Sequence, residues 1–284
     1  MEKLVGQKYW LKLAKNWRKV KAPVRPSRED VLFFKEESKK IIGKKKNIKI
    51  LIFGATPELR DLALSFKAEV VTIDQNLDMI LAMKNLMKHK ESNEVIIKGD
   101  WLSTPLKRNY FDLIWGDGVN TQFQWEKARF FYKHFYSLLK LNGYFVTRCF
   151  SLPDNVKVSD FTWKIIIDIF EKIGKNNKVS LQNLADLNIC LQLLSLNKNE
   201  YVKSPTIREL NQAFKFYPSL SKKIKKKIAK EMTLLYLSKE RKTWRTPTQK
   251  DTHKELENYF KIVKVVPSNY NYWKYVSKLF LLKK

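Results

Sequence analysis

The chain has 284 residues, of which 44% are apolar and 13% aromatic, and its formal net charge is +28. This composition excludes a disordered basic tail and predicts a packed core, in one large domain with an insertion or in two modest domains. Two cysteines and three histidines are too few for a disulfide framework or a four-ligand zinc site, so we expect reduced thiols and no metal.

The sequence contains no run of about eighteen uncharged apolar residues, and its N-terminus lacks the pattern of a signal peptide. It therefore predicts a cytoplasmic protein without a transmembrane segment. The positive charge favours attraction to RNA or another polyanion. Lysines are, however, spread through nearly every segment, which biased base composition in the source genome explains equally well. The charge alone leaves both interpretations open.

Residues 1–46 are expected to form an N-terminal extension or lid. A turn signal at residues 22–27 precedes a helix predicted over 27–42, with Ser27 as its N-cap and Asp30 as the capping-box partner. Four residues of this extension are candidate substrate contacts, although packing in a core is the more ordinary role of a tryptophan. They are Tyr9, Trp10, Trp17 and Arg25.

The hydrophobic period changes at residue 47. The apolar run over 48–53, ended by Gly54, is typical of a strand buried in a parallel sheet. Thr56 as N-cap, Pro57 at the first helical position and Glu58 in the first turn predict a helix that runs to about residue 66. A strand followed by a helix is the first unit of an α/β fold.

The alternation continues to residue 150. We expect strands over 69–74, 94–100, 110–117 and 144–150, and helices over 77–88 and 126–141, the last closed by Asn142-Gly143. Such a series predicts a doubly wound βαβ arrangement.

From residue 151 to 254 the pattern is helical, with helix starts expected at Ser159, Ser180, Ser204 and Ser219 and no strand between them. Within it, the segment 222–230 has isoleucines four residues apart between basic faces. A solvated helix is the ordinary interpretation of such a segment.

Two strands over 259–266 and 276–282, joined by a turn at 267–269, predict a closing antiparallel hairpin. The predicted fold class is therefore α/β, with a Rossmann-like seven-strand sheet built from residues 47–150 and 255–284. An N-terminal extension (1–46) and a helical insertion (151–254) complete it.

Small and acidic residues follow the first four predicted strands, whose carboxyl ends should share one edge of the sheet. The loop Gly54-Ala55-Thr56 allows close approach of a ligand, and Asp74 lies about twenty residues further on, where a carboxylate reaches ribose hydroxyls. Asp100 with Trp101, and Asp117 with Gly118, follow the next two strands. Each has a structural alternative, because a lone glycine, a capping Asp, a packed Trp or a tight turn would give the same residues.

The series resembles the class I S-adenosylmethionine-dependent methyltransferases over about half the chain. The motif Gly54-Ala55-Thr56-Pro57-Glu58-Leu59, with the upstream residues 25–30, looks like a bacterial group whose first motif is G-x-T-P-E-L. The resemblance implies S-adenosyl-L-methionine as cofactor, and it implies a set of contacts. Gly54, Ala55, Thr56 and Glu58 would line the methionine moiety, Asp74 and Gln75 the ribose, Asp100 and Trp101 the adenine, and Asp117 and Gly118 the methyl group, with Arg25 and Arg148 toward the acceptor.

Two departures from the family pattern matter. The strand before Gly54 has Ile50 and Phe53 where many relatives place an acid, so Glu58 or an N-terminal residue would take the amino-group contact. The fourth strand is followed by Gly116-Asp117-Gly118-Val119 and lacks the Asn-Pro-Pro-Tyr tetrad of amino-methylating nucleic-acid enzymes. This argues against exocyclic adenine amines and glutamine amides as acceptors.

The acceptor, a small molecule or an RNA, is not identified by the sequence, and no catalytic base is assigned. Asp117, Arg148 and His134 are candidate helpers, although pairing with a carboxylate would also explain Arg148, and packing in an aromatic helix face is the more ordinary role of His134. A rival hypothesis is a non-catalytic, basic nucleic-acid-binding protein on the same fold. A dehydrogenase is a third, which the closing hairpin and the single glycine oppose.

Overall fold

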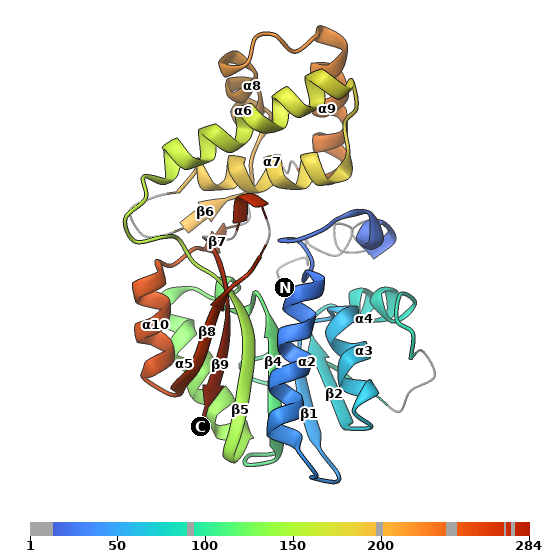
Figure 1. Ribbon diagram of the computed structural model, residues 1–284, viewed down its shortest axis with the longest axis vertical. Helices are drawn as coiled ribbons and strands as arrows, with labels where there is room; N and C mark the ends of the chain where they lie inside the picture. The colour runs from blue at the N-terminus through green and yellow to red at the C-terminus, as the bar shows by residue number, and fades with distance from the viewer. Residues whose placement is uncertain (1–13, 90–93, 197–200, 237–242, 270, 274–275) are drawn as a thin grey trace.

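The computed structural model describes residues 14–89, 94–196, 201–236, 243–269, 271–273 and 276–284. A seven-stranded sheet runs through them in the order β3-β2-β1-β4-β5-β9-β8 (Figure 1). Tyr9 and Trp10, two of the predicted substrate contacts, lie outside the described residues.

The first five strands of the sheet are parallel, β9 runs antiparallel to β5, and β8 runs antiparallel to β9. The predicted fold class and its closing hairpin are therefore confirmed. The strands are β1 (Lys49–Phe53), β2 (Glu69–Asp74), β3 (Val95–Lys98), β4 (Phe111–Asp117), β5 (Leu139–Phe150), β8 (Lys261–Pro267) and β9 (Ser277–Lys283). The order reverses between β1 and β4, which is the switch point where ligands bind in open α/β sheets.

Helices cover both faces of the sheet because alternate residues of each strand point to opposite sides. In β1, Leu51 and Phe53 pack toward α5 (Trp125–Leu138) and α10 (Gln249–Glu257). Ile50 and Ile52 pack toward α2 (Arg28–Ile42) and α3 (Pro57–Ser65). Helix α4 (Leu77–Lys84) packs against Ala55 and the N-terminal segment. The result is a three-layer sandwich.

The boundary between α5 and β5 differs from the prediction. The helix ends at Leu138 instead of continuing to 141, and the strand begins at Leu139. Leu139 pairs with Phe111, and the Tyr110 amide donates to the Leu138 carbonyl at 2.9 Å. Pairing with β4 therefore overrides the helical pattern, and Asn142 takes a left-handed φ of 62° in the turn that follows within β5.

The insertion contains strands that the sequence did not indicate. Tyr201–Lys203 (β6) and Thr243–Arg245 (β7) form a two-stranded antiparallel sheet, so the expectation of an uninterrupted helical segment is wrong. Three-residue strands are too short to show alternation. The remaining elements of the insertion are the helices α6 (Val158–Asn176), α7 (Leu181–Leu193), α8 (Ile207–Phe216) and α9 (Lys222–Leu235).

One of the four helix starts expected within the insertion lies at the predicted residue, and three are shifted. Ser180 caps α7, as expected. The other N-caps are Lys157, Thr206 and Ser221, each two residues from the serine that the sequence suggested. Hydroxyl and polar residues are close together there, so the local pattern does not select one of them.

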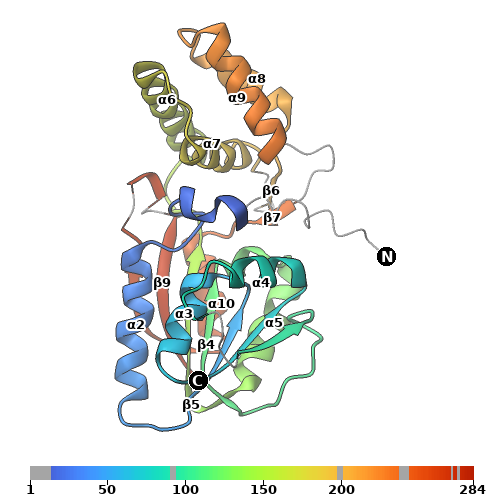
Figure 2. The ribbon, with the colours of Figure 1, turned by 90° about the vertical axis from the view of Figure 1, so that its right-hand side faces the viewer.

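The insertion stands beyond the carboxyl edge of the parallel strands, and the N-terminal segment lies between it and the sheet (Figures 1 and 2). The Lys21 amide donates to Gln182 Oε1 at 2.6 Å, and Gln182 Nε2 donates to the Ala22 carbonyl at 3.2 Å. The insertion and the N-terminal segment therefore contact each other at the edge where ligands bind in this type of sheet.

Candidate active site

The carboxyl ends of β2, β1 and β4 lie side by side. Phe53 pairs with Ile73 on one side and with Gly116 on the other, so Gly54 lies between Asp74 and Asp117. The Gly54 amide donates to the Ile73 carbonyl at 3.0 Å, which extends the pairing by one residue. Three of the residues predicted from separate segments thus share one edge.

Gly54 has a φ of +96°, a conformation that L side chains rarely adopt. A Cβ atom at this position would have Trp101 Cζ2 at 3.9 Å as its nearest neighbour, an ordinary contact distance. The backbone conformation, more than a lack of space, requires the glycine here. Because no atom crowds this position, a ligand can approach the Gly54 backbone closely.

Thr56 does not have the predicted capping role. The Thr56 side chain makes no hydrogen bond to the start of α3, and its hydroxyl donates to Asp117 Oδ2 at 3.4 Å. Proline at the first helical position already removes one N–H that a cap would satisfy, so the helix start tolerates this. The hydroxyl instead joins the first loop to the end of β4.

Asp74, Gln75 and Asp100 lie at or just after the carboxyl ends of the neighbouring strands β2 and β3. Asp74 Oδ1 accepts from the Asn76 amide at 2.8 Å, and Asp100 Oδ1 accepts from the Leu102 amide at 2.7 Å. Gln75 Nε2 donates to Asp100 Oδ2 at 2.8 Å. The N-cap of α4 is Asn76, so Asp74 does not cap that helix itself. Both carboxylates are thereby oriented by backbone amides at the strand ends.

Trp101 is fixed against the first loop. Its indole Nε1 donates to the Ile73 carbonyl at 2.9 Å, and its ring meets Phe53 edge-on with centroids 5.6 Å apart. Phe123 and Phe131 pack on it from the side of α5. Packing is therefore part of its role, and it also holds the indole close to Gly54.

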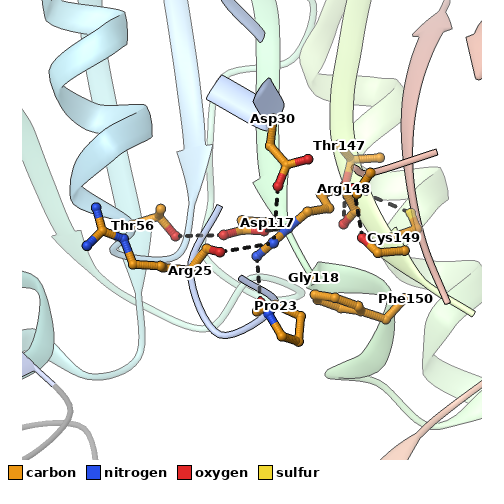
Figure 3. A network of polar contacts seen from close by, with 12 residues as sticks. Pro23, Arg25, Asp30, Thr56, Asp117, Gly118, Thr147, Arg148, Cys149 and Phe150 are labelled. Carbon is orange, nitrogen blue, oxygen red and sulfur yellow. Dashed lines mark hydrogen bonds and ion pairs between the residues drawn. The ribbon is translucent and has the colours of Figure 1, made fainter. Parts of the chain in front are cut away.

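Arg148 lies at the centre of a buried polar network between β4, β5 and the N-terminal segment (Figure 3). Its Nε donates to Asp117 Oδ1 at 2.5 Å, and its other nitrogens donate to the carbonyls of Pro23 at 3.0 Å and Arg25 at 3.2 Å. It also forms an ion pair of 3.5 Å with Asp30. Arg148 is 1% exposed, so these contacts make it an anchor for the N-terminal segment.

Asp117 belongs to the same network. Burial raises the pKa of Asp117, while the Arg148 guanidinium, at hydrogen-bond distance, opposes that rise. Because one carboxylate oxygen accepts from Arg148 and the other from Thr56, this carboxylate is engaged within the protein. It is poorly suited to remove a proton from an acceptor.

Glu58 connects the first loop to the N-terminal segment. Trp17 Nε1 donates to its two carboxylate oxygens at 2.9 and 3.1 Å, and Arg25 Nη2 lies 2.6 Å from Oε1. Burial raises the pKa of Glu58, and the Arg25 charge opposes this. An acid and a cation therefore lie at the N-terminus of α3, next to Gly54. Trp17 is buried, as packing predicted.

His134, weighed as a helper, lies elsewhere. Burial lowers the pKa of its imidazole, and the nearby charge of Arg108 contributes. Arg108 precedes the start of β4, so this pair lies toward the amino end of that strand, away from the site.

The sequence did not indicate Pro23 or Asp30 as site residues. Asp30 was expected only in the capping box, which it does form: the Ser27 amide donates to Asp30 Oδ2 at 2.8 Å and the Asp30 amide donates to Ser27 Oγ at 3.0 Å. The only sequence signal for Asp30 as a site residue was its place in the segment 25–30, upstream of the motif at Gly54.

The side chains present fit an S-adenosylmethionine molecule. Gly54 supplies the backbone conformation for close approach, and Asp74 and Asp100 supply acceptors for hydroxyl and amino groups. Glu58 and Arg25 supply opposite charges for an amino acid moiety. Within the described part of the chain, no group of three metal-ligating side chains occurs, and no helix has the length and hydropathy to cross a bilayer.

A family model described as a methyltransferase domain matches residues 53–147, the span from the end of β1 into β5. The chain carries a methyltransferase domain. With this match and the seven-strand topology, the chain is an S-adenosylmethionine-dependent methyltransferase whose acceptor is not identified. A comparison with curated proteins finds no match.

Solved structures share the fold of this methyltransferase at low sequence identity. An S-adenosylmethionine-dependent methyltransferase from Clostridium acetobutylicum is 14% identical, with 96% of this chain and 97% of that chain covered and a TM-score of 0.57. The N-methyltransferase NodS from Bradyrhizobium japonicum, solved with S-adenosyl-l-homocysteine, is 11% identical over 98% and 97% of the chains (TM-score 0.52). A putative Zn-dependent alcohol dehydrogenase from Rhodobacter sphaeroides is 14% identical over 98% of both chains (TM-score 0.59). Each shows similarity of fold alone.

Proposed function

We propose that this methyltransferase binds S-adenosylmethionine across the carboxyl ends of β1, β2, β3 and β4, and methylates an acceptor that enters beside Asp117. The observation that carries the proposal is the position of Gly54 between Asp74 and Asp117. The family with a G-x-T-P-E-L first motif is the proposed group. The cytoplasm remains the expected compartment.

The proposed contacts follow the chemistry of each side chain. Gly54, Ala55 and Thr56 line the methionine moiety, with Glu58 near its amino group and Arg25 near its carboxylate. Asp74 with Gln75 accepts from the ribose, and Asp100 with Trp101 flanks the adenine. Arg25 was expected to face the acceptor, and its ion pair with Glu58 moves it in this proposal to the methionine end.

Arg148 is proposed as a positioning residue. The sequence suggested a substrate contact, but a guanidinium that is 1% exposed and donates to Asp117 and to backbone carbonyls is already used inside the protein. Its role is to hold Asp117 and Gly118 at the end of β4, and to hold residues 23–30 next to them.

When bound, S-adenosylmethionine supplies a methyl group already activated by the sulfonium. The protein then has to orient the acceptor and exclude water, and these contribute most of the rate in such a displacement. Since Asp117 is engaged by Arg148, we assign no general base. The proposal therefore favours an acceptor, small molecule or RNA, whose nucleophile is reactive without one.

The test uses two variants of the same strand. Asp74→Asn removes the charge at the carboxyl end of β2, and Glu69→Gln removes a charge at its exposed amino end. Calorimetric titration with S-adenosylhomocysteine should show affinity about 10- to 100-fold lower for Asp74→Asn, as for loss of hydrogen bonds to a charged group. Glu69→Gln should bind like the unmodified protein. Equal affinity for all three proteins would contradict the proposed site.

A further inference from the structure

Helix α9 places its charges against the ordinary rules of helix stability. Six of the nine residues from Lys222 to Lys230 are lysines, and no acid lies in the first turn. Cations near a helix N-terminus oppose its dipole, and like charges four residues apart repel each other, each by a few tenths of a kcal/mol or more. Places where a sequence breaks local rules in this way are expected to be functional.

The lysines of α9 face solvent. The apolar side of the helix, Ile224, Ile228 and Met232, is buried in the core of the insertion. Five exposed ammonium groups remain on the outer side, and none of them forms an ion pair with an acid of the described residues. They are Lys222, Lys223, Lys226, Lys227 and Lys230.

Helix α6, in the same insertion, shows the contrast. Two of its three lysines and its N-cap lysine pair with acids three or four residues away: Lys157 with Asp160, Lys172 with Asp168, and Lys175 with Glu171. Unlike these pairs, the exposed charges of α9 add to one another and to the positive end of its dipole. A concentrated positive potential results, which attracts a polyanion.

An aromatic pair, in which Phe216 is exposed and Trp163 is partly buried, adjoins this helix. Phe216 at the end of α8 is 60% exposed and lies over Trp163 of α6, with ring centroids 4.0 Å apart and an angle of 35° between the planes. Only five residues separate Phe216 from Lys222, and Lys225 Nζ donates to the Pro218 carbonyl within that connection at 3.2 Å. In Figures 1 and 2 the connection lies at the end of the molecule furthest from the sheet.

We propose that the outer face of α9 and the Trp163–Phe216 pair form a binding surface for single-stranded nucleic acid. Lysines that follow the phosphates and an exposed aromatic ring on which a base stacks are the two features that such surfaces combine. A membrane is disfavoured, because an amphipathic helix binds lipid through its apolar face and here that face is inside the core. The surface is separate from the proposed cofactor site.

Fluorescence anisotropy with a labelled twelve-nucleotide uridine-rich RNA tests the charge. The variant Lys222→Gln/Lys223→Gln/Lys226→Gln/Lys227→Gln should lower the slope of log affinity against log salt by about 3, at about 0.7 for each lost phosphate contact. The matched control, Lys39→Gln/Lys44→Gln/Lys45→Gln/Lys46→Gln, removes the same charge from exposed positions at the opposite end of the molecule. An equal loss in both variants would overturn the proposal.

A second pair of variants tests the aromatic contact. Phe216→Ala should weaken RNA binding by roughly 5- to 150-fold, as for loss of one stacked base. Ile207→Ala, which removes another exposed apolar side chain from α8, should leave it unchanged. Unchanged affinity in Phe216→Ala would overturn the proposal, and so would binding that α9 supports to anionic lipid vesicles but not to RNA. Circular dichroism establishes that each variant is folded.

Discussion

The sheet edge and helix α9 use charge in opposite ways. At the sheet edge, Arg148 and Arg25 are engaged with carboxylates and carbonyl groups at short distances, and Arg148 is fully enclosed. On α9 the exposed lysines face solvent and form no ion pair with an acid in the part of the chain that the structure describes. The net charge of +28 therefore includes both cations that pair inside the protein and cations that face solvent.

The difference separates positioning from recruitment. A buried guanidinium with several acceptors fixes the segments that contact it, because moving either segment would leave a charge unpaired away from water. Exposed lysines fix nothing inside the protein, and their effect extends only over about a Debye length. Substitutions at the sheet edge should therefore change stability and cofactor binding, and substitutions on α9 should change only the response to polyanions.

The largest expected effect is at Arg148. Arg148→Met leaves Asp117 and Asp30 buried without their cation, and it should lower the free energy of unfolding by about 3–5 kcal/mol in urea titration. Adding Asp117→Asn in the same protein should recover part of this loss, because one unpaired charge is removed. A loss below about 1 kcal/mol would mean that the pair behaves like an exposed one.

A pH-dependent effect is expected at Asp186, where α7 meets the connection between β8 and β9. Burial raises the pKa of Asp186 to about 6, although Trp273 and Gln182 donate to its carboxylate. The folded protein thus binds this proton more tightly than the unfolded chain does. The contribution of Asp186 to the free energy of unfolding therefore increases as pH falls through about 6. Asp186→Asn should remove this contribution, which changes the slope of the free energy of unfolding against pH by up to about 1.4 kcal/mol per pH unit in this range.

Asp168 supplies a control of opposite sign. Burial raises the pKa of Asp168, but hydrogen bonds from Lys172 and Tyr272 outweigh it and hold this pKa below its usual value. Its contribution to stability is present above the unfolded pKa and is lost as pH falls through the folded one. Unfolding measured between about pH 2 and 8 should give difference slopes of opposite sign, below about pH 5 for Asp168→Asn and around pH 4 to 6 for Asp186→Asn. Slopes of the same sign would contradict these assignments.

Two glycines with positive φ separate backbone strain from ligand contact. Gly54→Ala and Gly43→Ala, at φ of +96° and +53°, should each cost about 1–2 kcal/mol of stability. Gly43 ends α2 and lies before the amino end of β1, whereas Gly54 follows its carboxyl end. Only Gly54→Ala should therefore also lower the affinity for S-adenosylhomocysteine, by about tenfold. Equal affinity in both variants would place the cofactor away from this loop.

The smallest expected stability effect is at Glu58. Glu58→Gln keeps an oxygen that accepts from Trp17 but removes the charge that pairs with Arg25. Stability should change by less than about 1 kcal/mol, as for a partly exposed ion pair. The affinity for S-adenosylmethionine, measured by calorimetry, should fall by about tenfold or more if Glu58 contacts the amino group. An unchanged affinity would exclude that contact.

Local patterns predicted the sheet because each strand carries its own period and each strand end its own small or acidic residue. Gly54, Asp74 and Asp117 come together for this reason. The network around Arg148 could not be found in this way, because Arg148 and Pro23 are 125 residues apart and nothing in either segment indicates the other. The same holds for Trp17 and Glu58.

Short or competing elements account for the remaining differences. Strands β6 and β7 have three residues each, which is below the length at which a period can be recognised. At the end of α5, a helical pattern continued into residues that pair with β4, and tertiary pairing prevailed over the local preference.

The most direct test of the central claim is calorimetric titration of the unmodified protein with S-adenosylmethionine, S-adenosylhomocysteine and NAD. We predict that the protein binds the first two at one site and does not bind NAD. Binding of NAD alone, or no binding of any of the three by a protein that unfolds cooperatively, would contradict it.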